Sequence, residues 1–328
     1  MHYLSIDTPC ATFNLKMKIP SEMISIFNLD GTMFSIEDFI ITVFCSVDDL
    51  WKEITQGEKI RRRGFAPSLS DSEIITMEIV GEFVGIDTDK GIWSYFRGHW
   101  FNLFPQIKSR STFVRQAANL WCYKQKLQQM LAKKIGGLAD SIHLIDGIPL
   151  PLCHYQRAKN CRLFAGSASF GYCATKDEKY YGFKGHLVIS LEGVITGFTL
   201  TPANGSERDA LWETASGISG LLIADKGYLG ADLQQDLSNW GIDLQTAKRS
   251  NMKDVRDRHW VKLLVKTRRL VETVIGQLSE RFHLQKVKAR DLWHLTNRIN
   301  RKLLAHTLAF WINRHSFHPL RFEQLISD

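Results

Sequence analysis

The sequence has no apolar run approaching the roughly 20 residues that cross a bilayer, although 44% of its 328 residues are hydrophobic. Its first residues also lack a basic start followed by an apolar block, so no secretory signal is expected. These absences disfavour a membrane-spanning or secreted protein. They predict a cytoplasmic protein with no membrane partner.

Cysteine is also sparse, and the chain has no Cys-x2-Cys pair of the kind that structural zinc sites usually show. The six cysteines are scattered at positions 10, 45, 122, 153, 161 and 173. The simplest interpretation is a set of buried thiols in a protein that needs no disulfides. A zinc site formed by Cys153, His154, Cys161 and Cys173 is the alternative.

Acidic charge is scarce in one segment of the chain. The whole sequence carries 42 Lys and Arg against 34 Asp and Glu, a net charge of +8. Residues 244–302 alone hold 16 basic and 5 acidic side chains, an excess of 11. A solvated basic surface is the ordinary explanation, but so concentrated an excess favours a polyanion partner, most commonly nucleic acid.

Periodicity divides the chain, because it contains no internal repeat and no low-complexity tract. Residues 1–32 show no clear period and are interpreted as an N-terminal extension, which could be flexible. In that case Met33 is the ancestral start of the protein. Residues 33–137 predict a helical domain. Residues 138–316 predict a mixed α/β domain, and residues 317–328 form a C-terminal tail.

Helix caps mark the first domain. Ser35 precedes Asp38, and Ser70 precedes Glu73, at the spacing in which a serine side chain caps the third helical residue. A further helix is expected from Ser109 or Ser111 to about residue 134. This domain is interpreted either as a helix-turn-helix that binds DNA or as a dimerisation domain.

The second domain alternates strand and helix patterns. Apolar runs predict strands over 142–146, 186–190, 194–201, 220–224 and 243–247. Helical patterns cover 208–216, 234–239, 260–284 and 295–314. Strands that lead into helices in this way are typical of a mixed α/β fold.

Two aspartates stand at the ends of predicted strands. Asp146 closes the strand 142–146, and Asp225 directly follows the strand 220–224. A carboxylate at the carboxyl end of a strand points into the crevice where open α/β sheets bind ligands. One such aspartate is weak support, because Asp is common in turns, but two in distant strands indicate a shared site.

A third acid, Glu272, lies beside the apolar stripe of the predicted helix 260–284. Its ordinary role is an i, i+4 pair with Arg268, which contributes only about 0.2–0.5 kcal/mol, and Glu280 lies roughly on the same face. Three carboxylates on two strand ends and a helix suit two Mg²⁺ ions, with Mn²⁺ as a substitute. The basic segment would then bind the phosphates of DNA.

Several short motifs together resemble those of a known family. They are Ile145–His154 (IDGIPLPLCH), Gly171–Lys176 with Tyr181–His186, Ala224–Tyr228 (ADKGY) and Arg268–Leu278 (RRLVETVIGQL). Over about Met33 to Arg314 the chain is similar to DDE transposases of the insertion-sequence family numbered 982. The resemblance implies a ribonuclease H-like catalytic domain, a mixed sheet flanked by helices. Its catalytic and metal-binding acids fall on Asp146, Asp225 and Glu272.

The resemblance also implies an activity: cleavage and joining of phosphodiester bonds at insertion-sequence ends in a prokaryotic cell. Its partners would be transposon ends and target DNA, and the active complex would be a homo-oligomer. The expected DNA contacts are Lys184, Lys226, Lys248, Arg249, Arg268, Arg269, Arg281, Lys286, Lys288 and Arg290. A metal-dependent nuclease without strand transfer and a non-catalytic DNA-binding regulator are the alternatives.

Three positions depart from the motifs of the resembling proteins. Gly147 stands where a serine is expected after the first aspartate. Val265 replaces a tyrosine, and Ser279 a lysine, that are frequent around the last motif in the broader group. Arg268 matches the arginine of that motif.

Overall fold

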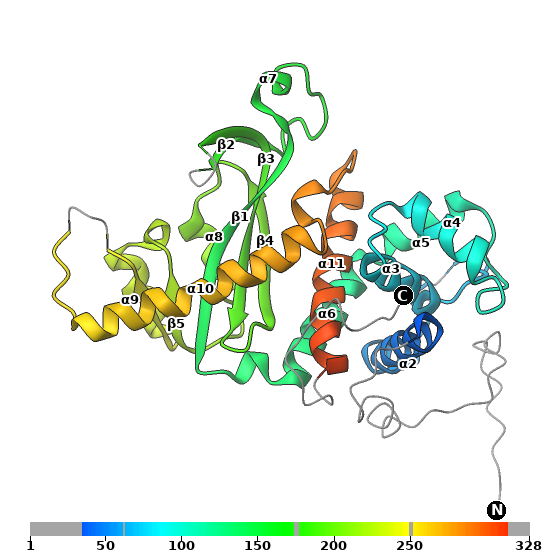
Figure 1. Cartoon of the computed structure of the whole chain (residues 1–328), viewed down its shortest axis with the longest axis horizontal. Helices are drawn as coiled ribbons and strands as arrows, with labels where there is room; N and C mark the ends of the chain where they lie inside the picture. Colours follow the sequence, from blue (N-terminus) through cyan, green and yellow to red (C-terminus); the bar gives the residue numbers. More distant parts are fainter. Residues whose placement is uncertain (1–34, 62, 174–176, 249–251, 314–328) are drawn as a thin grey trace, which may run out of the picture. The chain divides into compact units, whose positions relative to one another are not determined.

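The computed structural model describes residues 35–61, 63–173, 177–248 and 252–313 (Figure 1). They form two compact units, one of residues up to Leu127 together with those from Asn300, the other of Gln128–Ile299. The sequence had placed a boundary at 137/138 and kept residues up to 316 in the second domain. The predicted extension 1–32 and tail 317–328 lie outside the described residues.

The first unit is helical. It contains α2 (Ile36–Thr55), α3 (Asp71–Phe83), α4 (Asp89–His99), α5 (Arg110–Asn119), the first part of α6 (Trp121–Ile135) and the later part of α11 (Leu292–Asn313). Ser35 caps α2 by accepting a hydrogen bond from the Asp38 N–H at 3.1 Å. Ser70 and Glu73 form both hydrogen bonds of a capping box at α3. These two predicted helix starts are confirmed. They could be predicted because a cap is formed by residues close together in the sequence.

Two details of the helical prediction were wrong. The single helix expected to begin at Ser109 or Ser111 is two helices, α5 and α6, because Leu120 between them leaves the helical conformation (φ −93°, ψ 7°). Leu120 is fully buried, so its side chain is held by packing that no local sequence signal reveals. Helix α4 was missed inside an aromatic-rich stretch, although Thr88 caps it.

Buried ion pairs hold the helical unit together. Arg301 of α11 is fully buried and donates to Glu82 of α3 and, at 2.6 Å, to Asp89. Lys302 donates to Glu82 at 2.6 Å. Both cations belong to the basic segment 244–302, so part of its charge excess is neutralised inside the protein and is not offered to a polyanion.

The second unit is built on one mixed sheet. Its strands are β1 (Ile142–His154), β2 (Ser169–Cys173), β3 (Glu178–Ser190), β4 (Ile195–Pro202), β5 (Gly220–Ala224) and β6 (Ile242–Thr246). The order is β2-β3-β1-β5-β6, with β4 also paired to β3. Pairs among β1 to β4 are antiparallel, whereas β5 runs parallel to both β1 and β6. The predicted mixed α/β fold is confirmed.

Strand β1 does not end at Asp146 as the sequence predicted; it continues to His154. The reason is long-range pairing, because β3 accompanies β1 along its whole length while β5 stops beside Ile145. Beyond that point β5 no longer occupies the second edge of β1. Pro149 and Pro151 are tolerated there because proline is compatible with an edge that needs no ladder N–H. Strand β2 and the first half of β3 were also missed.

Helices α7 (Tyr155–Ala158), α8 (Glu207–Thr214), α9 (Ala231–Asn239) and α10 (Arg258–Glu280) complete this unit. Figure 1 shows α10 crossing the sheet, and it contacts β1 and β5. Its buried stripe is Leu264, Val271, Val274 and Leu278. Helix α8 packs instead on β3 and β4. Helix α10 therefore lies on the two strands that lead to the aspartates, whereas α8 reaches this region through η2, which directly follows Asp225.

Candidate active site

The two strand aspartates lie next to each other because their strands are parallel neighbours. Ile145 of β1 pairs with Ala224 of β5, and the following residues are Asp146 and Asp225. At this point β5 ends and the chain turns into the short helix η2 (Lys226–Tyr228), while β1 continues. Their side chains are 19% and 31% exposed, so both carboxylates are only partly hydrated.

Arg268 of α10 contacts both aspartates and also Glu272. Its Nη1 lies 2.8 Å from Asp225 Oδ1, and its Nη2 lies 3.5 Å from Asp146 Oδ2 and 3.3 Å from Glu272 Oε1. The local pair of Arg268 with Glu272 considered from the sequence therefore exists. The same guanidinium also joins the two strand acids, so the structure brings all three predicted acids around one cation.

Glu272 is the most exposed of the three acids, with 57% of its side chain accessible. It lies on the surface of α10, one turn after Arg268, and Arg268 supplies its contact with the site. Glu280, considered as a competitor, is the exposed last residue of the same helix. The contact through Arg268 favours Glu272 over Glu280 as the third acid.

The environment of Asp146 opposes ionisation. Burial raises the pKa of its carboxyl group from 3.8 to about 6, against the hydrogen bond from the Gly147 N–H and the attraction of Arg268. The charges of Asp225 and Glu207 add to the increase. A cation bound next to such a buried carboxylate would stabilise its ionised form and lower its pKa.

A fourth acid, Glu207, lies at the site and was not predicted from the sequence. It begins α8 and its Oε1 lies 3.1 Å from Lys184 Nζ. A Cβ placed on Gly227 would overlap Glu207 Oε2, and one placed on Gly147 would lie 3.7 Å from Oε1. The only sequence signal was the glycine that closely follows each aspartate, Gly147 and Gly227, and it did not indicate which side chain would fill the space.

A buried hydrogen-bonded chain lies beside the acids. The Tyr228 hydroxyl is 3.2 Å from His186 Nδ1, and His186 Nε2 is 3.0 Å from the Thr201 hydroxyl. Burial lowers the pKa of His186 to about 4 and raises the pKa of Tyr228, to which the charges of Glu207, Asp146 and Asp225 also contribute. Both side chains are therefore neutral at neutral pH and add no charge beside the acids.

The basic side chains predicted to contact DNA divide into two groups. Lys226, Arg269, Lys286, Lys288 and Arg290 are exposed. Others have protein partners: Lys184 pairs with Glu207, Arg268 with the acids, and Lys248 Nζ lies 3.2 Å from the Lys253 carbonyl oxygen. Arg281 is half-buried, and Arg249 lies outside the described residues.

A pocket of about 340 Å³ opens beside Arg268 and Glu272, and Lys248 and Arg269 also line it. Within it Arg256 Nη2 lies 2.7 Å from Asp254 Oδ2, and hydrogen bonds from Arg256 lower the pKa of Asp254 to about 2. The lining residues come from the ends of β5 and β6, from the segment that joins β6 to α10, and from α10 itself, so the pocket lies next to Arg268 and Glu272.

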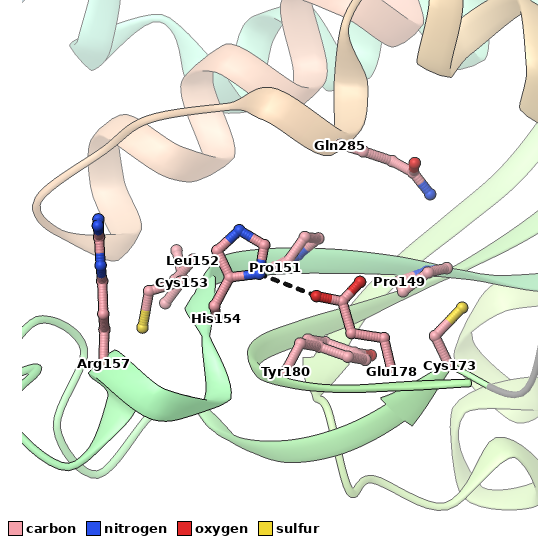
Figure 2. Close-up of a pocket in the computed structure, with 10 residues that line it drawn as sticks. All are labelled: Pro149, Pro151, Leu152, Cys153, His154, Arg157, Cys173, Glu178, Tyr180 and Gln285. Carbon is pink, nitrogen blue, oxygen red and sulfur yellow. Dashed lines mark hydrogen bonds and ion pairs between the residues drawn. The ribbon is translucent and has the colours of Figure 1, made fainter. Parts of the chain in front are cut away.

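A second pocket, of about 270 Å³, contains most of the residues considered for zinc (Figure 2). His154 Nδ1 lies 2.8 Å from Glu178 Oε1 there, with Cys153 and Cys173 on the pocket wall. The expectation of buried thiols was wrong, because all five cysteines in the described ranges are partly exposed. Across those same ranges, no three His, Cys, Asp or Glu side chains are arranged to hold a metal ion.

Comparison with known proteins gives one family match. Residues 136–292 match the family described as the transposase DDE domain, which supports a DDE transposase. A solved structure of the piggyBac transposase in a synaptic complex with hairpin DNA is 9% identical and covers 89% of this chain and 78% of that one, with a TM-score of 0.46. No curated protein matches the chain. In the described residues no helix has the length and hydropathy to span a membrane.

Proposed function

We propose that the chain is a DNA transposase that cleaves and joins phosphodiester bonds at the ends of an insertion sequence. The match of residues 136–292 supports the general class. The observation that carries the proposal is the convergence of Asp146, Asp225 and Glu272 on Arg268. Acids from two strands and a helix meet there although they lie far apart in sequence, as a metal-dependent DNA-cutting site requires.

We further propose that the unit Gln128–Ile299 contains a ribonuclease H-like catalytic domain of the family numbered 982. The antiparallel set β1, β3 and β4, followed by the parallel strands β5 and β6, supports this assignment. Residues 33–137 would bind the DNA end or form a homo-oligomer contact. The protein would act on DNA in the cytoplasm of a prokaryotic cell.

The acids suit Mg²⁺ in their chemistry. Carboxylate oxygens are the ligands that Mg²⁺ prefers, and it keeps several waters, so few side chains suffice. Asp146, Asp225 and Glu272 would hold two Mg²⁺ or Mn²⁺ ions, which supply activation of the attacking oxygen and stabilisation of the leaving oxygen. In the described ranges no three His, Cys, Asp or Glu side chains are arranged to hold a metal ion as they stand, and Arg268 is the cation that these carboxylates contact. Metal binding here would require Arg268 to give way and the acids to close around the ion.

The remaining side chains act on DNA by charge. Lys226 follows Asp225 directly and is exposed, so it can bind a phosphate next to the acids. Arg269 is exposed on α10 beside the pocket of about 340 Å³. Both would position the backbone of the DNA without reading its sequence. Arg268 can exchange its carboxylate partners for a phosphate oxygen when other cations neutralise the acids.

The test is cleavage and joining of a labelled DNA end that carries the element's terminal sequence, with Mg²⁺. Asp146→Asn, Asp225→Asn and Glu272→Gln should each abolish both products, while Glu280→Gln, an exposed acid on the same helix, should keep them. Activity in all three variants while they remain folded would refute the site. A plain nuclease would cut without joining, and a regulator would bind DNA in EDTA and never nick it.

A further inference from the structure

We propose that Glu207 is a fourth acidic residue of this site, where its carboxylate joins those of Asp146 and Asp225 in binding a divalent cation. The inference rests on the proposed function, because it adds a residue to the same site. Neither the strand-end pattern nor the family motifs point to Glu207. Its position in the fold does.

Glu207 is held firmly. It stands in the first turn of α8, which Ser206 caps by accepting the Asp209 N–H at 3.3 Å. The helix packs on β3, β4 and η2. The Glu207 side chain is 27% exposed, against 57% for Glu272. Glu207 is therefore the less exposed of the two glutamates near the aspartate pair.

The absence of a side chain at Gly227 leaves space that the carboxylate of Glu207 occupies. The backbone of Gly227 is not among those with positive φ, so its conformation does not require glycine. The three heavy atoms nearest to an added Cβ are all carboxyl atoms of Glu207. Glycine at this position, two residues after Asp225, gives the carboxylate room to approach the turn that carries Asp225.

Gly147 gives similar room on the other strand. A Cβ there would lie 3.7 Å from Glu207 Oε1 and 3.6 Å from Lys184 Cδ, so a longer side chain would compete with both. The charge of Glu207 also acts on Asp146 and on Tyr228. Lys184 Nζ lies 3.1 Å from Glu207 Oε1, so it partly neutralises this carboxylate in the absence of a metal ion.

Calorimetric titration of the full chain with Mn²⁺, without DNA, tests the role directly. Glu207→Gln keeps the size and removes the charge, and it should weaken Mn²⁺ binding by about 10-fold to 100-fold, the usual effect of losing a group that supports a metal site. Glu213→Gln, which removes an exposed acid from the same helix, should leave the affinity unchanged. Unchanged affinity in Glu207→Gln would overturn the inference.

Lys184→Met distinguishes two roles of Glu207: binding the metal ion directly, or only holding Lys184 in place. It frees the Glu207 carboxylate, so Mn²⁺ affinity should equal or exceed that of the wild type. A loss as large as in Glu207→Gln would mean that Glu207 acts only through Lys184, against the inference. If Glu207→Gln does not fold, Glu207→Asp serves instead: its shorter carboxylate should bind Mn²⁺ more weakly, and unchanged affinity would count against the inference.

Asp225→Asn distinguishes the two levels of the argument. If it loses Mn²⁺ binding and Glu207→Gln does not, the divalent site stands and the role of Glu207 is wrong. If both variants bind Mn²⁺ as the wild type does, the divalent site itself is wrong, and with it the proposed function.

Discussion

Asp146 should destabilise the metal-free protein at neutral pH, and Asp146→Asn should therefore stabilise it. Burial raises the pKa of this carboxyl from 3.8 to about 6 in the folded state. Between pH 3.8 and about 6 the native state holds a proton that the unfolded state has already released, and at neutral pH both states carry the ionised carboxylate. Stability contributed by the protonated form is present below pH 3.8 and is lost as the pH rises through about 6.

The magnitude follows from the difference between the two pKa values. About two units correspond to roughly 3 kcal/mol of unfolding free energy, and the side chain is only 19% exposed, so little is lost to solvent screening. Asparagine keeps an oxygen for the Gly147 N–H, and Arg268 keeps Asp225 and Glu272 as partners. Asp146→Asn should gain about 3 kcal/mol at pH 8 and nothing near pH 4.

The assay is urea unfolding in EDTA between pH 4 and pH 8, in which unfolding is monitored by hydrogen exchange in peptides of β1 and β5. These peptides report only the unit that contains Asp146. Asp254→Asn is the control of opposite sign, because hydrogen bonds from Arg256 lower the pKa of Asp254 to about 2. It should lose stability to a similar extent throughout pH 4–8, because the contribution of the ionised Asp254 is lost only as the pH falls from 3.8 through about 2. A pH-independent or negative effect of Asp146→Asn would refute the reasoning.

Three further changes have defined outcomes. Arg301→Met should cost about 3–5 kcal/mol in urea unfolding, because it leaves the carboxylate of Glu82 buried with one cation fewer. Gly227→Ala should displace the Glu207 carboxylate and weaken Mn²⁺ binding in calorimetry with every charge retained; unchanged binding would contradict this. Ser70→Ala should lower the thermal stability of the helical unit by about 1 kcal/mol, measured by circular dichroism, through loss of the capping box.

The sequence predicted best where the signal is local. Ser35 and Ser70 identified two helix starts because a cap is made by residues three positions apart. The strand 220–224 was recognised because its apolar run ends where the chain turns. The mixed fold class followed from the alternation of such elements. None of these features depends on a partner distant in the sequence.

The sequence failed where partners are distant. The strand 142–146 was expected to end at Asp146, but β3 holds β1 extended past Pro149 and Pro151 to His154, and only the strand register explains it. Arg268 was expected to contact DNA because it matches the arginine of the last family motif, and its pair with Glu272 was the local alternative. The crossing of α10 over β1 and β5 also places it on the two aspartates, which the sequence did not reveal. Glu207 was missed because its neighbours in space are Gly227 and Lys184 rather than residues near it in the chain.

In the proposed site, acidic side chains are paired with basic ones. Asp225 and Glu272 share Arg268, which also lies 3.5 Å from Asp146, and Glu207 has Lys184. The raised pKa of Asp146 lowers its charge further only as the pH falls through about 6. Isolated carboxylates this close would repel one another, so the metal-free fold needs these cations. Divalent ions would take over that role and release both cationic side chains. The released cations would then face DNA phosphates, so metal binding and DNA binding should strengthen each other.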